Sequence, residues 1–239
     1  MSTSKKAPGK KPEDEGKSGL WIMALTAAAV AAAAIAAYLY VPSKEGGSPS
    51  GGGPAVSGVM APGPLPENAL GRDDAPVTVI EYASMTCSHC AEFHTTVFPK
   101  LKEEYIDTGK VRYILREFPG DSVAFSISAL ARCAGKDKYF SFVGAVFTTF
   151  DKWACRECDI KGGIMNLWKQ TGMSEAEFDR CLDEKSNKAM LDGINEVRHR
   201  GLQDYGVNAT PTIFVNGTML TGGNTFEELE KAIDPLLTG

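Results

Sequence analysis

The sequence lacks an excess of basic residues, and it has no internal repeat apart from two cysteine pairs with the same spacing. It also has few large apolar side chains between 42 and 65. Its 239 residues carry 25 lysines and arginines against 30 aspartates and glutamates, a net charge of -5. Proteins that bind nucleic acid through its phosphates present a basic surface, so this balance argues against a nucleic-acid partner. The 42–65 segment is rich in glycine, proline and serine and cannot bury enough surface to offset its ordering entropy. We therefore predict a flexible linker there.

One long apolar run is present near the N-terminus. Residues 20–41, roughly 22 in number, contain no charged side chain; five lysines precede them and Lys44 alone follows closely. A run of this length can cross a bilayer as a helix, whereas a signal-peptide core is usually about 7 to 15 residues. The positive-inside rule then keeps 1–19 in the cytoplasm and exports the rest of the chain. We predict a transmembrane anchor over 20–41. A cleaved signal peptide is the alternative, because the alanine run offers many A-x-A sites.

The most informative motif is Cys87-Ser88-His89-Cys90, which lies between a strand-like run over 77–82 and a helix-like run. Two cysteines three residues apart at the start of a helix lie on one face within bonding reach, and the unpaired N–H groups of that turn favour a thiolate. A thiolate is the attacking or the leaving group in thiol–disulfide exchange. The motif therefore predicts a redox-active cysteine pair.

Zinc binding and a purely structural disulfide are the alternatives for this motif. A zinc site needs two more ligands, and the other closely spaced cysteines, Cys155 and Cys158, follow only after a long stretch with several helical patterns. A CxxC motif beside a strand–helix unit is typical of thioredoxin-like proteins. We therefore favour redox chemistry and predict neither a metal site nor a cofactor.

All six cysteines lie in the part of the chain predicted to be exported, which fits an oxidising compartment. Cys133 and Cys181 lie in helical patterns, whereas Cys155 and Cys158 bracket a short polar turn. The economical pairing joins Cys133 to Cys181 and Cys155 to Cys158 as structural disulfides. Crossed pairings remain open at this stage.

Hydrophobic periodicity predicts one α/β domain over 66–239. Strands over 77–82 and 111–118 enclose a helix that Pro99 should kink, which gives a parallel β-α-β unit. Helical patterns fill about 122–206, and Ser174 begins a capping box. A hairpin turn at 216–217 and an amphipathic helix over 225–237 close the chain.

This order of elements and motifs resembles the DsbA-like branch of the thioredoxin superfamily. The resemblance covers 66–239, and its motifs are Glu81, the CxxC motif, Arg-Glu-Phe-Pro at 116–119 and Ala-Thr-Pro-Thr-Ile-Phe-Val-Asn-Gly at 209–217. It implies a thioredoxin-like α/β fold with an inserted helical domain, preceded here by the single transmembrane helix. It also implies a periplasmic thiol:disulfide oxidoreductase. Ser88 and Thr210 depart from the best-known oxidase, which has proline and valine there; several isomerases and reductases share the threonine.

Chemistry assigns roles within the motif. Cys87, nearer the helix start and more exposed, should exchange with substrate, and Cys90 should resolve the mixed disulfide. His89, between the two sulfurs, can stabilise the Cys87 thiolate. We expect His94 and His199 to be solvated helix residues.

The resemblance supplies three further site residues. It implies that Glu81 is a buried acid that accepts a proton from Cys90. It also implies that Pro211 is a cis-proline, which would expose the backbone of Thr210 to pair with an extended substrate segment.

These features predict a bacterial inner-membrane protein with its catalytic domain in the periplasm, or a soluble periplasmic protein if a signal peptide is cleaved. We expect it to form disulfides in exported proteins that carry free thiols, and to be reoxidised by a quinone-linked membrane partner. A disulfide isomerase or reductase with the same site is the nearest alternative. A non-catalytic thiol metal carrier or a chaperone is the alternative from another class.

Overall fold

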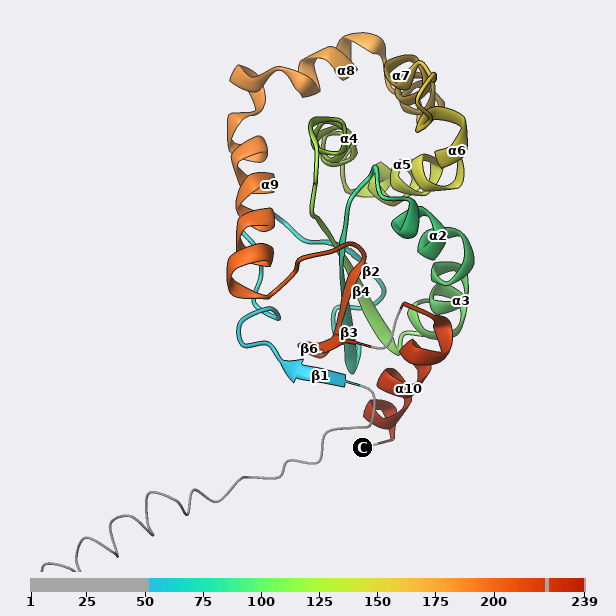
Figure 1. Cartoon of the computed structure of the whole chain (residues 1–239), viewed down its shortest axis with the longest axis vertical. Helices are drawn as coiled ribbons and strands as arrows, with labels where there is room; N and C mark the ends of the chain where they lie inside the picture. Colours follow the sequence, from blue (N-terminus) through green and yellow to red (C-terminus); the bar gives the residue numbers. More distant parts are fainter. Residues whose placement is uncertain (1–51, 222–223, 239) are drawn as a thin grey trace, which may run out of the picture. The chain divides into compact units, whose positions relative to one another are not determined.

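The computed structural model describes residues 52–221 and 224–238. They contain a six-stranded sheet with helices on both faces (Figure 1) and the strand order β1-β6-β5-β3-β4-β2. The strands are β1 (Gly52–Ala55), β2 (Asn68–Leu70), β3 (Val77–Ala83), β4 (Val111–Glu117), β5 (Thr212–Val215) and β6 (Thr218–Leu220).

The helices fall into three groups. The first follows β3 and consists of α2 (Ser88–Thr96), α3 (Phe98–Leu101) and the π-helical turn η1 (Lys102–Ile106). The inserted group consists of α4 (Ser122–Cys133), α5 (Lys136–Thr148), α6 (Phe150–Trp153), α7 (Ile160–Gln170), α8 (Glu175–Leu182) and α9 (Glu184–Asp204). The last helix is α10 (Phe226–Leu237). This is the thioredoxin-like α/β architecture with a helical insertion that the sequence predicts.

The β-α-β unit is confirmed. Strands β3 and β4 are parallel, with Val77 opposite Val111, and β5 runs antiparallel on the other side of β3, with Glu81 opposite Ile213. Pro99 lies in the first turn of α3, next to the break at Val97 that separates α2 from α3, as expected from its missing N–H. The hairpin between β5 and β6 also forms as predicted, with positive φ angles at its two turn residues.

Alternation along β3 divides the core into two layers. Val79 belongs to the cluster that contains residues of α2, α5 and α10, whereas Tyr82 packs with Val197 of α9 on the other face. Glu81 stands two residues after Val79 and therefore points toward α2. The strand thus directs one carboxyl group into the apolar layer beneath the CxxC helix.

The predicted linker over 42–65 is wrong from residue 52 onward. Residues 52–55 form β1, Val59 is fully buried, and the Arg116 guanidinium donates to the carbonyl oxygens of Val59 (2.8 Å) and Ala61 (2.9 Å). Composition misled here because a distant arginine and the β6 edge supply partners that local sequence does not reveal. Strand β2, three residues that pair with β4, was also not predicted.

The predicted anchor over 20–41, the tail over 1–19 and the rest of the linker, 42–51, lie outside the described residues. Across 52–221 and 224–238, no helix is long and apolar enough to cross a membrane.

Candidate active site

The two motif cysteines stand where β3 gives way to α2. The Cys87 N–H donates to the carbonyl oxygen of Ser84 (3.1 Å), which closes the turn, and Cys87 is the N-cap residue of α2 with extended φ and ψ. Cys90 follows in the first turn, so both sulfurs lie on one face of the helix. Cys87 is partly exposed and Cys90 is fully buried, and neither forms a disulfide in the structure.

Their surroundings shift the pKa values of the two thiols in opposite directions. The pKa of Cys87 is lowered to about 5, first by a hydrogen bond from Cys90, then by one from Thr210 and by the backbone N–H groups of Cys90 and His89. The pKa of Cys90 is raised strongly, first by burial, then by its hydrogen bond to Cys87 and by the charge of Glu81. At neutral pH the reduced site therefore holds a partly exposed thiolate beside a buried thiol.

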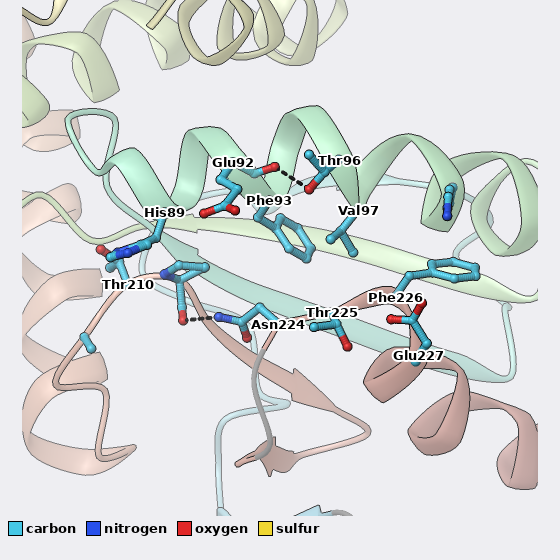
Figure 2. A pocket seen from close by; sticks show the side chains of 13 residues that line it. His89, Glu92, Phe93, Thr96, Val97, Thr210, Asn224, Thr225, Phe226 and Glu227 are labelled. Carbon is cyan, nitrogen blue, oxygen red and sulfur yellow. Dashed lines mark hydrogen bonds between the residues drawn. The ribbon is translucent and has the colours of Figure 1, made fainter. Parts of the chain in front are cut away.

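The segment before β5 completes the site. The Thr210–Pro211 peptide bond is cis, as expected, and Cys87 Sγ lies 3.3 Å from the Thr210 carbonyl oxygen, to which the protonated thiol donates. Thr210 is partly exposed, and the exposed His89 side chain lies beside it (Figure 2). A residue distant in sequence thus contacts the exposed sulfur directly.

Beneath Cys90 lies a buried carboxyl group with a histidine partner. The Glu81 and His94 side chains are 0% and 4% exposed, and Glu81 Oε2 lies 3.1 Å from His94 Nε2. The Tyr113 hydroxyl donates to the same oxygen, while Glu81 Oε1 is buried and has no hydrogen-bond partner within 52–221 and 224–238. Our expectation of a solvated His94 is wrong: its four-residue spacing from Cys90 puts both on the buried face of α2. That spacing is the signal that we overlooked.

The comparisons with known proteins agree with this geometry. The profile of the thioredoxin family matches residues 65–235. The chain belongs to this family. The crystal structure of alpha-DsbA1 from Wolbachia pipientis is similar, with a TM-score of 0.65 and 33% sequence identity over 74% of this chain and 94% of that one. Within the thioredoxin family, the domain is therefore DsbA-like.

Two curated relatives carry disulfide-related names. A Rickettsia conorii protein provisionally named protein-disulfide oxidoreductase is 34% identical over 169 residues, which are 70% of this chain and 59% of that protein. Disulfide bond formation protein D of Bacillus subtilis is 28% identical over 189 residues, 71% of this chain and 77% of that protein. The chain thus matches less than two thirds of the rickettsial relative's length.

A groove of about 580 Å³ runs from the CxxC motif along α2 to the start of α10 (Figure 2). Phe93, Val97 and Phe226 give it an apolar lining, and Glu92 and Glu227 add carboxylates to its wall. The Asn224 side chain donates to the Pro211 carbonyl oxygen (3.0 Å), which ties this wall to the cis-proline segment.

The turn before Cys87 is held by a further hydrogen bond that we did not predict. The Thr86 hydroxyl donates to Asp121 Oδ2 (2.6 Å), and Asp121 Oδ1 accepts from the Ala124 N–H (2.8 Å) as the N-cap of α4. One carboxylate therefore joins the residue before Cys87 to the start of the helical insertion. An aspartate before a helical run signals a cap, but sequence alone does not reveal the bond to Thr86.

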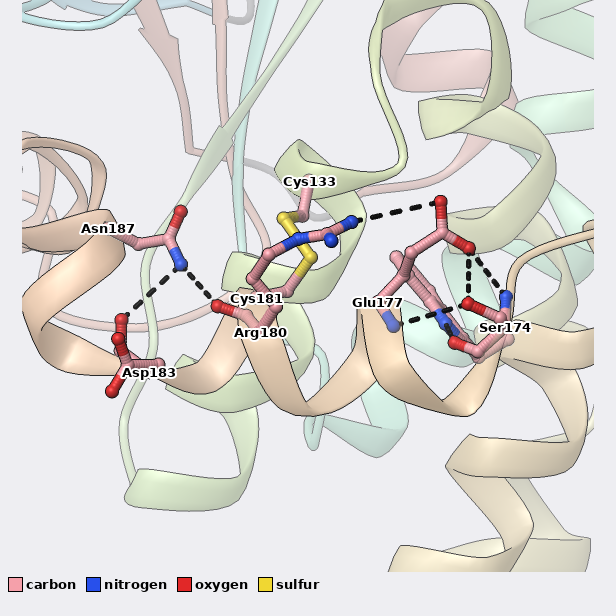
Figure 3. The surroundings of a disulfide bond; sticks show 8 residues. Cys133, Ser174, Glu177, Arg180, Cys181, Asp183 and Asn187 are labelled. Atoms are coloured by element: carbon pink, nitrogen blue, oxygen red, sulfur yellow. Dashed lines mark hydrogen bonds and ion pairs between the residues drawn. A yellow bond between two sulfur atoms is a disulfide. The ribbon is translucent and has the colours of Figure 1, made fainter.

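Two disulfides are present, in the pairs that the sequence favoured. Cys133 at the end of α4 is joined to Cys181 in α8 (Figure 3), and Cys155 is joined to Cys158 in the turn before α7. Cys181 is buried, whereas Cys155 is exposed. The first pair therefore lies within the packed insertion and the second at its surface.

His199 is exposed on α9, as expected. In the described part of the chain, no group of three or more histidine, cysteine, aspartate or glutamate side chains has a geometry that could hold a metal ion.

Proposed function

We propose that the protein is a thiol:disulfide oxidoreductase that forms disulfides in exported proteins through Cys87 and Cys90. In the oxidised enzyme a substrate thiolate attacks Cys87 Sγ, the bond between the two enzyme sulfurs breaks, and Cys90 leaves as a thiolate that takes up a proton. A second substrate thiolate then attacks the substrate sulfur of the mixed disulfide. Cys87 leaves as a thiolate, so the substrate gains a disulfide and the enzyme gains two electrons.

The observation that carries the proposal is that the pKa of Cys87 is lowered while that of Cys90 is raised. A Cys87 pKa of about 5 stabilises the reduced enzyme and makes Cys87 a good leaving group, and both effects favour oxidation of the substrate. Burial keeps Cys90 protonated once it has been released. We assign Glu81 as the acid–base group for Cys90, because it is buried and acts electrostatically on that thiol.

We further propose that the substrate binds beside Thr210 and Pro211. Thr210 is partly exposed and its carbonyl oxygen adjoins Cys87, so an extended segment could pair with its backbone as an added strand while the substrate cysteine reaches the site. The groove along α2 would take neighbouring side chains of the substrate. His89, at the mouth of that groove, would contact the substrate or the Cys87 thiolate.

We place the reaction on the periplasmic side of a bacterial inner membrane, with 20–41 as the anchor and a quinone-linked membrane protein as the reoxidant. The oxidising compartment is supported by the two disulfides outside the active site, and the anchor by the length and flanking lysines of the apolar run.

The equilibrium between the Cys87/Cys90 pair and glutathione tests this proposal. We expect a reduction potential between about -180 and -120 mV, the range that separates protein disulfide isomerase from the strongest oxidase. A value near that of thioredoxin, about -270 mV, would instead assign the site to a reductase.

Cysteine variants of the full-length chain separate the enzyme from a metal carrier or chaperone. Cys87→Ala should abolish disulfide transfer to a reduced substrate, and Cys90→Ala should accumulate mixed disulfides through Cys87. A Cys87→Ala protein that still oxidises its substrate at the parent rate would refute the assignment of the nucleophile.

A further inference from the structure

The Glu81 carboxyl group is held on one oxygen only. His94 Nε2 lies 3.1 Å from Oε2 and the Tyr113 hydroxyl donates to the same atom, whereas Oε1 has no hydrogen-bond partner among the described residues although it is buried. Buried carboxylate oxygens are usually satisfied, so an orphaned one in a packed layer requires a reason. Cys90 and His94 are both buried on α2, one helical turn apart, so the carboxyl group that meets His94 with Oε2 lies beneath Cys90 as well. The charge of Glu81 also acts on the Cys90 thiol, which makes that thiol the natural partner of Oε1.

His94 is placed to fix that arrangement. It follows Cys90 by four residues on α2, so one helical turn sets the separation between the thiol and the group that holds the carboxylate. Its imidazole stacks on Phe147, with ring centroids 4.4 Å apart, and lies 4.9 Å from the Phe98 ring. Rings from two other helices therefore hold the orientation of the imidazole.

We propose that His94 is a positioning residue for proton transfer at Cys90: its hydrogen bond to Oε2 fixes the Glu81 side chain so that Oε1 stays available to the thiol. This inference rests on the proposed thiol–disulfide exchange. With only the Tyr113 hydroxyl in place, the carboxyl group can rotate about its terminal torsion, and neither oxygen is then held toward Cys90.

The step it serves is the closure of a mixed disulfide at Cys87. The Cys90 thiol gives its proton to Glu81 Oε1, and Cys90 Sγ forms a bond to Cys87 Sγ. The bond from Cys87 to the foreign sulfur breaks, and that sulfur leaves as a thiolate with the electron pair. In substrate oxidation the same groups act in reverse, and Glu81 returns the proton to Cys90.

The titratable groups around the pair set the pH range of this step. Cys90 and Tyr113 both interact electrostatically with Glu81, and Tyr139 of α5 acts in turn on Tyr113. Burial raises the pKa values of Tyr113 and Tyr139 well above their ordinary range, so both stay neutral where the enzyme works. Phe98 and Phe147 are the neighbours from α3 and α5, and they carry no charge.

An aromatic disulfide reagent that releases a coloured thiolate tests the proposal on the full-length protein in detergent. The reduced protein should release one thiolate when Cys87 attacks the reagent, and a second when Cys90 closes the disulfide. We expect the first rate of His94→Leu to stay within about twofold of the parent value. The second rate should fall by about tenfold or more, a smaller effect than the 10²–10⁴-fold contribution of a group that itself transfers the proton. The pH profile of the second rate should move to higher pH.

Matched variants identify the cause. His94→Gln keeps an N–H donor of similar reach and should recover most of the second rate, whereas His94→Asn is too short and should not. His94→Leu should add no further slowing in a Glu81→Gln background, because the two residues act through one carboxyl group. His199→Leu, on an exposed surface of α9, should change neither phase. If His94→Leu does not fold, the comparison of Gln with Asn decides the same question.

The outcomes separate the two proposals. A parent protein that shows no second phase and no disulfide transfer would overturn the proposed function, and the role of His94 with it. A parent with both phases, combined with an unchanged second phase in His94→Leu and His94→Asn, would overturn the role of His94 alone. Equal slowing of both phases in Leu, Gln and Asn variants would also overturn it, because that pattern indicates a purely structural residue.

Discussion

Cys87 Sγ lies 3.3 Å from the Thr210 carbonyl oxygen, across 123 residues of sequence. This contact brings the residue before the cis-proline against the exposed sulfur, where the Thr210 side chain also helps to lower the pKa of Cys87. The chemistry of the CxxC motif is therefore shared between the start of α2 and the segment before β5.

Replacing Thr210 with valine should make the site less oxidising. The carbonyl contact is retained but the hydroxyl is lost, so the pKa of Cys87 should rise and the reduced form should lose part of its stabilisation. Ultraviolet titration of the thiolate and equilibration with glutathione measure both effects. Thr210→Ser, which keeps the hydroxyl, is the control, and a more oxidising valine variant would contradict this account.

The stability of the reduced protein should depend on pH through Cys87. Its pKa is about 5 in the folded protein and about 9 in its ordinary state, so its contribution is complete above pH 9 and is lost as the pH falls toward 5. Cys90 stays protonated in this range because burial raises its pKa. The melting temperature of the reduced form minus that of the oxidised form should therefore fall between pH 9 and pH 5. A constant difference would show that Cys87 is an ordinary thiol, and Cys87→Ser should remove the dependence.

Much of the fold could be predicted because its signals are local. The alternation over 77–82, Pro99 and the Asn216-Gly217 turn each specify a short piece of backbone without help from the rest of the chain. Strand β1 could not be predicted, because its glycine-rich sequence has little strand propensity and forms only against the β6 edge.

The site residues also divide into those that a local pattern predicts and those that depend on distant parts of the chain. The spacing of Cys87 and Cys90 predicts their redox chemistry, and Thr210 and Pro211 were found through the family resemblance. The hydrogen bond between Thr86 and Asp121 joins residues that no local pattern connects. His94 could have been found, because a histidine one helical turn after a buried cysteine shares its face.

Asp121→Ala should impair both stability and activity. The variant loses the N-cap of α4, a loss of about 0.5–2 kcal/mol, and also the bond that holds Thr86 beside the active-site turn. Asp159 is a matched control, because it caps α7 through the Gly162 N–H (2.9 Å), whereas Thr86 bonds to Asp121. Asp159→Ala should lower the melting temperature to a similar extent without slowing thiol–disulfide exchange. Equal slowing in both variants would mean that the Thr86 contact is not needed.

The two disulfides should differ in their contribution to stability. Chain-entropy estimates give about 4 kcal/mol for the Cys133–Cys181 bridge, with a sequence separation of 48, and about 2 kcal/mol for Cys155–Cys158, with a separation of 3. Replacing the first pair with alanine should therefore lower the melting temperature by about 8 °C or more, and replacing the second pair by roughly half as much. Calorimetry on oxidised proteins measures both. The reverse order would indicate that the surface turn, not the helix–helix link, limits stability.

We expect the pairing of β1 with β6 to keep the domain from associating edge to edge. Gly52 pairs with Leu220 and Ala55 with Thr218, so β1 covers the edge of the sheet that β6 would otherwise present. A protein cut at residue 66 would expose that row of backbone donors and acceptors to neighbouring molecules, and the buried Arg116 would lose the Val59 and Ala61 carbonyl oxygens. Such a fragment should self-associate through its open edge, whereas one that retains β1 should remain monodisperse.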